Sequence, residues 1–145
     1  MADTVLGDLK VGSVMSWDVL LLPLPAGIAS IDELGVDHEL PPVGSRFWVL
    51  DALQSAVHDV DLTDSAWGEL VGPSWVIELS IGEDDPVESV MLHVRGGGDE
   101  VLPVIFGLAR ALGCRVLDSS SGDLLAENTA AGWHAFQGFR DRVVT

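Results

Sequence analysis

The chain has 145 residues, 48% of them hydrophobic, and its 23 acidic residues against 7 lysines and arginines give a net charge of −16. This length suits one domain with a core, and the apolar content is too high for a disordered chain. The charge would repel nucleic acid and anionic membranes, and no apolar run approaches the roughly 20 residues of a membrane span.

The N-terminal sequence MADTVLGDLK lacks a basic segment followed by an apolar one, so no signal peptide is expected. A lone cysteine, Cys114, excludes an internal disulfide and a metal site built from several cysteines. We therefore expect a single α+β domain over residues 1–145, located in the cytoplasm of a bacterial-type cell.

The first half of the chain predicts one strand, a long loop and two helices. Val14 to Leu22 is dense in apolar residues and predicts a buried strand. Residues 23–44 hold four prolines and predict an acidic loop with a helical turn at 30–34. Ser45 can cap a helix to about residue 58, and a second, short helix is expected from residue 63 or 64 to 72. The apolar face expected on the first helix is Phe47, Leu50, Leu53 and Val57.

The second half predicts a hairpin, a helix and a short strand. Residues 75–81 and 87–95 alternate between apolar and polar side chains, as two half-buried antiparallel strands do. A helix follows to Leu112, then a strand over 115–118, a brief pairing at 124–125 and a last helix from Thr129. The order predicts a ferredoxin-like βαββαβ sheet with helices on one face plus a C-terminal helix.

Three glycines, Gly96 to Gly98, stand between the second strand of the hairpin and the following helix. A phosphate-binding turn would leave backbone N–H groups open at that helix terminus. Here Asp99 and Glu100 follow at once, and they can satisfy those groups themselves and would repel a phosphate. The segment also lacks the Lys-Ser/Thr pair of a P-loop, so it predicts a structural corner.

Candidate chemistry is confined to one face of the hairpin. Glu78, Met91, His93 and Arg95 are expected on its open side, where a histidine and a carboxylate could perform acid–base chemistry or hold a small molecule. The other reading of this face is a solvated surface or a homodimer interface.

Cys114 is expected to be a buried structural thiol. Trp67, Trp75 and Trp133 are expected in the core, and the alternative is that one of them lies at an interface.

No motif identifies a catalytic residue, a metal site or a cofactor, so an enzyme is the less favoured class. The segment 58–64 places three aspartates close together, but it lacks the glycine and glutamate that a calcium loop needs. A solvated turn is the expected structure there.

The negative charge is placed unevenly, because residues 1–100 hold 19 of the acids against Lys10, Arg46 and Arg95. A concentrated negative field attracts basic partners, although acidity can also serve solubility alone. The acids expected to contact a basic protein lie in three segments and are Asp32, Glu33, Asp37, Glu39, Asp59, Asp61, Asp64, Glu83, Asp84 and Asp85.

The segment EDDPVESVMLHVRGGGDEVLPVIFGLARALGCRVLD at 83–118, with the chain's size and charge, resembles the small acidic immunity proteins of bacterial toxin systems. The resemblance implies a protein that binds a basic toxin and blocks it, with no nucleic-acid or membrane partner. It assigns no role to any single residue. The alternative from the residues is a small enzyme or small-molecule-binding domain that uses the open face around His93.

Overall fold

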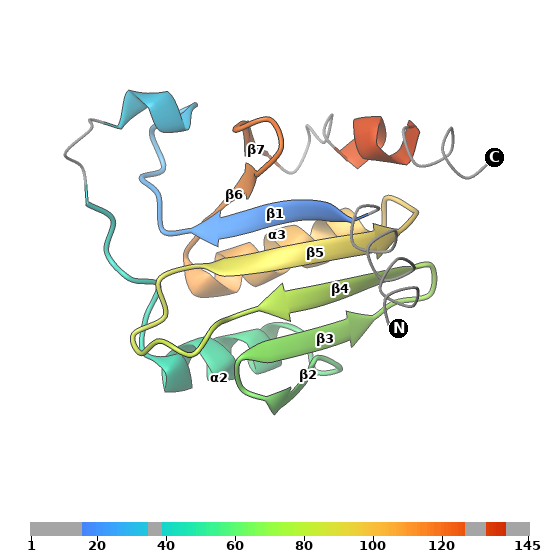
Figure 1. Cartoon of the computed structure of the whole chain (residues 1–145), viewed down its shortest axis with the longest axis horizontal. Coiled ribbons are helices and arrows are strands. Elements are labelled where there is room, and N and C mark those ends of the chain that lie inside the picture. The colour runs from blue at the N-terminus through green and yellow to red at the C-terminus, as the bar shows by residue number, and fades with distance from the viewer. Residues whose placement is uncertain (1–15, 35–38, 127–132, 139–145) are drawn as a thin grey trace, which may run out of the picture.

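The computed structural model describes residues 16–34, 39–126 and 133–138. Its centre is a seven-stranded antiparallel sheet in the order β2-β3-β4-β5-β1-β6-β7 (Figure 1). The strands are β1 (Trp17–Leu22), β2 (Asp61–Asp64), β3 (Trp67–Val71), β4 (Trp75–Ser80), β5 (Val90–Gly96), β6 (Arg115–Asp118) and β7 (Leu124–Leu125).

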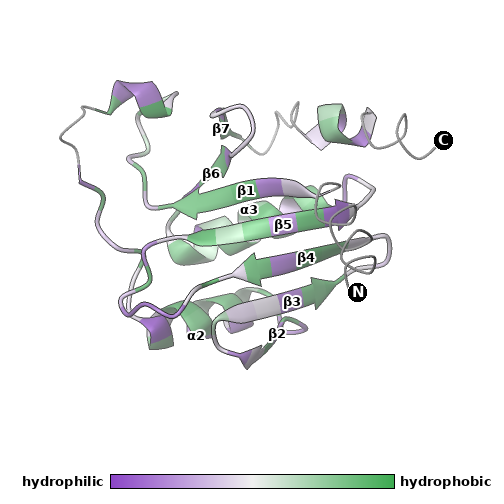
Figure 2. Ribbon diagram, viewed as in Figure 1, coloured by the Kyte–Doolittle hydropathy of each residue, from purple (hydrophilic) through white to green (hydrophobic). Residues whose placement is uncertain are grey.

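Two helices, α2 (Arg46–Ala56) and α3 (Val101–Leu112), cover the same face of the sheet, behind the strands in Figure 1. Burial alternates along β1 and β4, and along β5 as far as Arg95, because successive side chains of a strand point to opposite faces. The buried set faces the helices and forms one core, and the other set forms the open face. Figure 2 shows the hydrophobic colour along the central strands and α3.

The predicted ferredoxin-like sheet is not confirmed, because the observed strand order differs. The four strands that the sequence predicted are neighbours, in the order β4-β5-β1-β6. The hairpin of β2 and β3 extends the β4 side of this group, and β7 extends the β6 side. The class α+β, an antiparallel sheet and helices on one face are as predicted.

The short helix predicted from residue 63 or 64 to 72 is wrong, since this segment forms the β2–β3 hairpin. The Oδ1 atom of Asp64 accepts a hydrogen bond from the backbone N–H of Ala66, so Asp64 closes a turn and does not cap a helix. In β3, Gly68 and Leu70 are buried and alternate with three exposed residues, the pattern of a strand at the side of a sheet.

The first helix forms as predicted and places Leu53 in the core, with Leu50 and Val57 partly buried against it; Phe47 is the one residue of the predicted face that is exposed. Ser45 caps the helix by accepting from the backbone N–H of Trp48. Its buried residues are Val49 and Leu53, whereas Phe47, which the sequence placed on the buried face, is 81% exposed. Phe47 lies in the first turn, two residues before the buried Val49, and therefore points away from the core.

The remaining helical segments are short. The helical turn expected at 30–34 is the 3₁₀ helix η1 (Ile31–Glu33). Residues 133–138 are helical, and Trp133 is fully buried against Trp17, with ring centroids 5.2 Å apart. The predicted start of this last helix at Thr129 lies outside the described residues. Within the described ranges, no helix has both the length and the apolar character needed to cross a membrane.

Candidate functional site

The open face of the sheet brings together the polar residues that the sequence singled out on the hairpin. His93 in β5 lies opposite Asp18 in β1 on one side and opposite Glu78 in β4 on the other. Arg95 follows two residues later and therefore shares this face. Each of these side chains is partly buried, because the flanking strands and the neighbouring side chains shield it.

Two pairs of side chains define the geometry of this face. The Nδ1 atom of His93 lies 2.9 Å from Oδ1 of Asp18, and the Ser16 hydroxyl donates to the same oxygen at 2.8 Å. The Arg95 guanidinium contacts the Glu78 carboxylate at 2.5 Å. Beside them, the Trp67 indole stacks on the His93 ring with the ring centroids 5.8 Å apart.

These six side chains line a pocket of about 200 Å³, which we call the open-face pocket. Met91, predicted to share the site, does not line it. Met91 pairs with Leu20 and Ser80, two residues along β5 from His93. The sequence pattern did not identify Ser16, Asp18 and Trp67, because their proximity to His93 depends on the strand order. For Asp18, the alternation of residues in β1 was the only available signal.

The contacts in the open-face pocket limit its chemistry. The Ser16 hydroxyl donates to Asp18, which differs from the hydroxyl-to-imidazole contact that activates a nucleophile in a hydrolytic triad. Asp18 fixes the orientation of the imidazole, and Glu78 neutralises Arg95. The arrangement suits the retention of a small polar molecule better than covalent catalysis.

The second candidate is a group of carboxylates at the end of the sheet where β4 ends and β5 begins. We call it the acidic end, and it comprises Glu39, Asp64, Glu83, Asp84, Asp85 and Glu88, which are all exposed. They come from three segments of the chain: the segment before α2, the β2–β3 turn and the loop between β4 and β5.

Arg46 organises the acidic end. Its guanidinium donates to the backbone carbonyls of Ser65, Gly82 and Asp84, which joins the β2–β3 turn to the β4–β5 loop. Its backbone N–H donates to Oδ1 of Asp85 at 3.1 Å, at the N-terminus of α2. Asp64 and Glu83 therefore line the same hollow beside Arg46.

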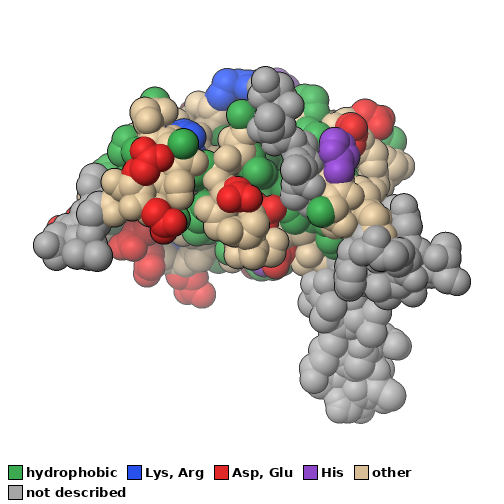
Figure 3. Space-filling view, turned by 90° about the horizontal axis from the view of Figure 1, so that it is seen from above, with side chains coloured by type: hydrophobic (Ala, Val, Ile, Leu, Met, Phe, Trp, Pro, Cys, Tyr) green, Lys and Arg blue, Asp and Glu red, His purple; other side chains and the backbone are tan. Residues whose placement is uncertain are grey.

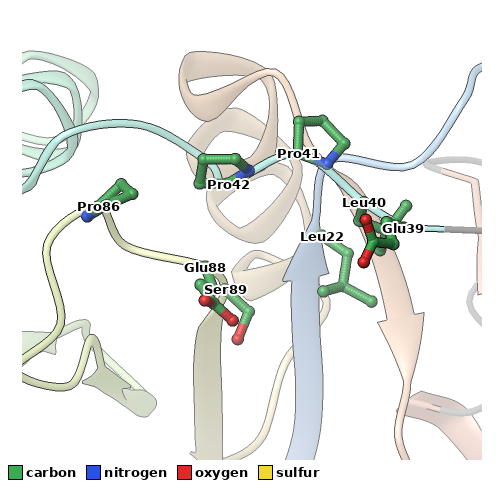
Figure 4. Close-up of a pocket in the computed structure, with 8 residues that line it drawn as sticks. All are labelled: Leu22, Glu39, Leu40, Pro41, Pro42, Pro86, Glu88 and Ser89. Carbon is green, nitrogen blue, oxygen red and sulfur yellow. The ribbon is translucent and has the colours of Figure 1, made fainter.

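Two further carboxylates of the acidic end, Glu39 and Glu88, line a larger hollow of about 650 Å³ (Figure 4). Glu39 and Glu88 lie on opposite sides of Leu22 in that view, with Pro41, Pro42 and Pro86 forming the rim. Backbone hydrogen bonds between Val87 and residues 43 and 44 connect the β4–β5 loop to the segment that leads into α2. The β4–β5 loop itself carries four of the six carboxylates of the acidic end, Glu83, Asp84, Asp85 and Glu88.

The other predicted partner-binding acids are less closely associated with this end. Asp61 continues the acidic surface along the hairpin, where it lines a hollow with Asp64. Asp59 follows the C-terminus of α2, whereas Arg46 begins that helix. Asp32 and Glu33 lie in η1, which is tied to the β6–β7 side by pairing of Ser30 with Asp123. Asp37 lies outside the described residues.

Two of these carboxylates, Asp61 and Glu33, accept hydrogen bonds from neighbouring residues in their own segments. Hydrogen bonds from the side chain and the backbone of Thr63 lower the pKa of Asp61, because they stabilise its charged form. Glu33 accepts from the backbone N–H groups of Ala29 and Ser30 and completes a capping box around η1. The Glu33 carboxylate is therefore engaged within its own segment.

The glycine corner at Gly96 to Gly98 is structural, although not through the capping that the sequence suggested. Glu100, at the N-cap of α3, makes no side-chain capping hydrogen bond. The Asp99 carboxylate instead lies 3.2 Å from Nε2 of His134. Gly96 is needed because its φ is +97° and a Cβ atom there would lie 2.3 Å from the Ser74 carbonyl oxygen.

The remaining sequence candidates occupy structural positions. Burial raises the pKa of the Cys114 thiol to about 11, which opposes a reactive thiolate. Trp75 and Trp133 are buried as expected, but Trp67 is 41% exposed because β3 turns it to the open face. In the part of the chain that the structure describes, no group of three or more His, Cys, Asp or Glu side chains is placed to hold a metal ion.

The cations of the described residues are used within the fold. Arg95 pairs with Glu78, and the Arg115 guanidinium donates to the backbone carbonyls of Pro25, Ala26 and Ile28. The view in Figure 3 shows acidic side chains at several places and few basic ones between them.

Comparison with known proteins finds no match among family models, curated proteins or solved structures.

Proposed function

We propose that this chain is a binding protein that neutralises a basic protein partner through its acidic end, in the manner of a bacterial immunity protein acting on a toxin. One observation carries the proposal. Six exposed carboxylates from three chain segments gather at one end of the sheet, and Arg46 among them is occupied by backbone carbonyls.

Such a surface acts in two ways on a basic partner. Exposed carboxylates at its rim raise the association rate by steering, and the effect weakens as salt screens the charges. The anchoring of the β4–β5 loop by Arg46 fixes part of the surface before the partner arrives. A fixed surface loses less conformational freedom on binding, which favours affinity.

The test begins with the partner, captured on the immobilised chain from the native cell at low salt and released at high salt. Association rates are then compared for the wild type and a triple variant, Glu39→Lys, Glu83→Lys and Glu88→Lys. We expect association to slow on the order of tenfold at low salt, with a flatter salt dependence. Addition of the wild-type chain should also inhibit the partner's own activity.

A matched control makes the same change of net charge elsewhere, at Asp59→Lys, Glu100→Lys and Asp123→Lys, which are exposed positions outside the acidic end. This variant should retain most of the association rate. Equal slowing in both triple variants would mean that net charge alone attracts the partner, and the proposed surface would be wrong.

The open-face pocket supports a second candidate, a domain that binds or converts a small molecule around His93. It is favoured by the convergence of Asp18, Glu78, His93 and Arg95 on one small pocket. His93→Ala serves both proposals in the same experiment. The variant should bind the basic partner as the wild type does, whereas a loss of function in this variant alone would favour the small-molecule alternative.

A further inference from the structure

Two aromatic side chains are exposed at the start of α2, next to the acidic end. Phe47 is 81% exposed and Trp48 is 44% exposed, while the same helix buries Val49 and Leu53. Exposed aromatic residues of this size contribute large contact areas to protein interfaces, and tryptophan is enriched among the residues that dominate binding energy. The fold leaves this pair without a core to enter.

The Trp48 indole packs on the backbone of Gly44 and leaves 44% of its surface exposed. It lies over Gly44, where an added Cβ atom would be 2.7 Å from the ring atom Cε3. Its backbone N–H donates to the Ser45 hydroxyl, and Gly44 pairs with Val87 of the β4–β5 loop. A side chain that is already in contact with the fold has less conformational freedom to lose on binding than one that extends into solvent.

Carboxylates lie on both sides of the aromatic pair. Asp85 accepts from the backbone N–H of Arg46, the residue before Phe47. Asp51 lies one helical turn after Phe47 and is exposed on the same side of α2. Glu88 follows Val87, which pairs with the backbone beneath Trp48. The pair is therefore an apolar centre within an acidic rim, the general layout of a protein interface.

The charge of the rim selects the occupant. A second copy of this chain would bring its own carboxylates against the rim, and like charges at close range oppose association. A basic segment meets both the rim and the centre if it carries a large apolar side chain between lysines or arginines. The apolar contact would govern the lifetime of the complex, because truncation of a central anchor mainly changes the dissociation rate.

We propose that Phe47 and Trp48 are the apolar anchor of the acidic end and that they receive a large apolar side chain from a basic segment of the partner. This inference rests on the proposed function, because it takes the acidic end as the binding surface. It adds the chemistry of the partner's segment and predicts which contact is insensitive to salt.

Two synthetic peptides of equal charge test the inference by calorimetry at about 150 mM salt, where steering is largely screened. One peptide carries Leu-Phe between two groups of three lysines, and the other carries Ser-Ser at that place. We expect the wild type to bind the Leu-Phe peptide about tenfold more tightly. The variant Phe47→Ser with Trp48→Ser should bind both peptides equally, at the affinity of the Ser-Ser peptide.

The controls separate this inference from the proposed function. Val71→Ser removes another exposed apolar side chain, 66% exposed at the far end of β3, and should keep the preference. Phe47→Ser alone covers the case in which the Trp48 change unfolds the chain. If the aromatic variants keep the wild-type preference, the anchor is wrong and the acidic end stands. If the triple lysine variant of the acidic end binds both peptides as the wild type does, the proposed function itself fails.

Discussion

Some charged side chains of this molecule form hydrogen bonds within the fold, whereas others face solvent. Arg46 and Arg115 donate to backbone carbonyls, and Asp118 is buried where it accepts from the indole N–H of Trp17 at 3.1 Å. A buried carboxylate held by several donors resists substitution more than an exposed one. The acids that serve the fold are thus distinguishable by their partners from those that face solvent.

The reactivity of the Cys114 thiol provides a test at this scale, because its burial should raise the thiol pKa and slow alkylation. Desolvation disfavours the thiolate and raises the pKa to about 11, from 9.0 for a free thiol. At pH 8 the folded chain should react with iodoacetamide roughly a hundredfold more slowly than the same chain unfolded in urea. The rate of the folded chain should keep rising to about pH 11. A plateau near pH 9 in the folded state would contradict the raised pKa.

The residues of the open-face pocket show what alternation alone can predict. The period of two placed Glu78, His93 and Arg95 on one face correctly, because it depends only on each strand being a strand. Asp18 and Trp67 could not be assigned to them, because their position depends on β1 lying beside β5 and on β3 extending the sheet. Those pairings involve contacts between distant parts of the chain, which local pattern does not encode.

At the scale of elements, the corner between β5 and α3 has two glycines with positive φ, Gly96 and Gly98, and Gly96 is the more closely packed against the backbone. A Cβ atom at Gly96 would lie 2.3 Å from the carbonyl oxygen of Ser74 and 2.7 Å from Cα of Trp75, and its φ is +97°. Gly96→Ala should therefore lower the free energy of unfolding by about 3 kcal/mol or more, through strain and steric overlap together. Urea denaturation measures the change.

Gly113 at the C-terminus of α3 is the matched control. It also has a positive φ, +68°, but no atom lies within 4 Å of an added Cβ. Gly113→Ala should destabilise by only about 1–2 kcal/mol, the strain of a left-handed backbone. Equal losses at the two glycines would show that the close approach of β5 to Ser74 does not matter.

The elements that sequence predicted best are those with strong local signals. The β4 and β5 strands and α3 follow from clear periodicity, and α3 ends at Leu112 as predicted, with Gly113 in the left-handed conformation after it. The β2–β3 hairpin was missed, because Asp64 is equally suited to capping a helix and to closing a turn. Only pairing with β4 decides between the two, and that pairing is a property of the folded sheet.

The whole molecule carries a net charge of −16, which opposes its own folding at low ionic strength. The free energy of unfolding should rise by on the order of 1 kcal/mol when sodium chloride is increased from about 10 to 300 mM, since salt screens the repulsion. The triple variant with lysines at Glu39, Glu83 and Glu88 should show a smaller rise. A salt-independent stability in the wild type would mean that the carboxylates lie too far apart to repel one another.

The two margins of the seven-stranded sheet are short or charged. The outermost strands are β2, of four residues with a register irregularity and two aspartates, and β7, of only two residues. Unpaired strand margins template the addition of further chains, and short, irregular or charged margins prevent it. Edge-to-edge pairing of two copies through either margin is therefore disfavoured, although one face of the sheet is open.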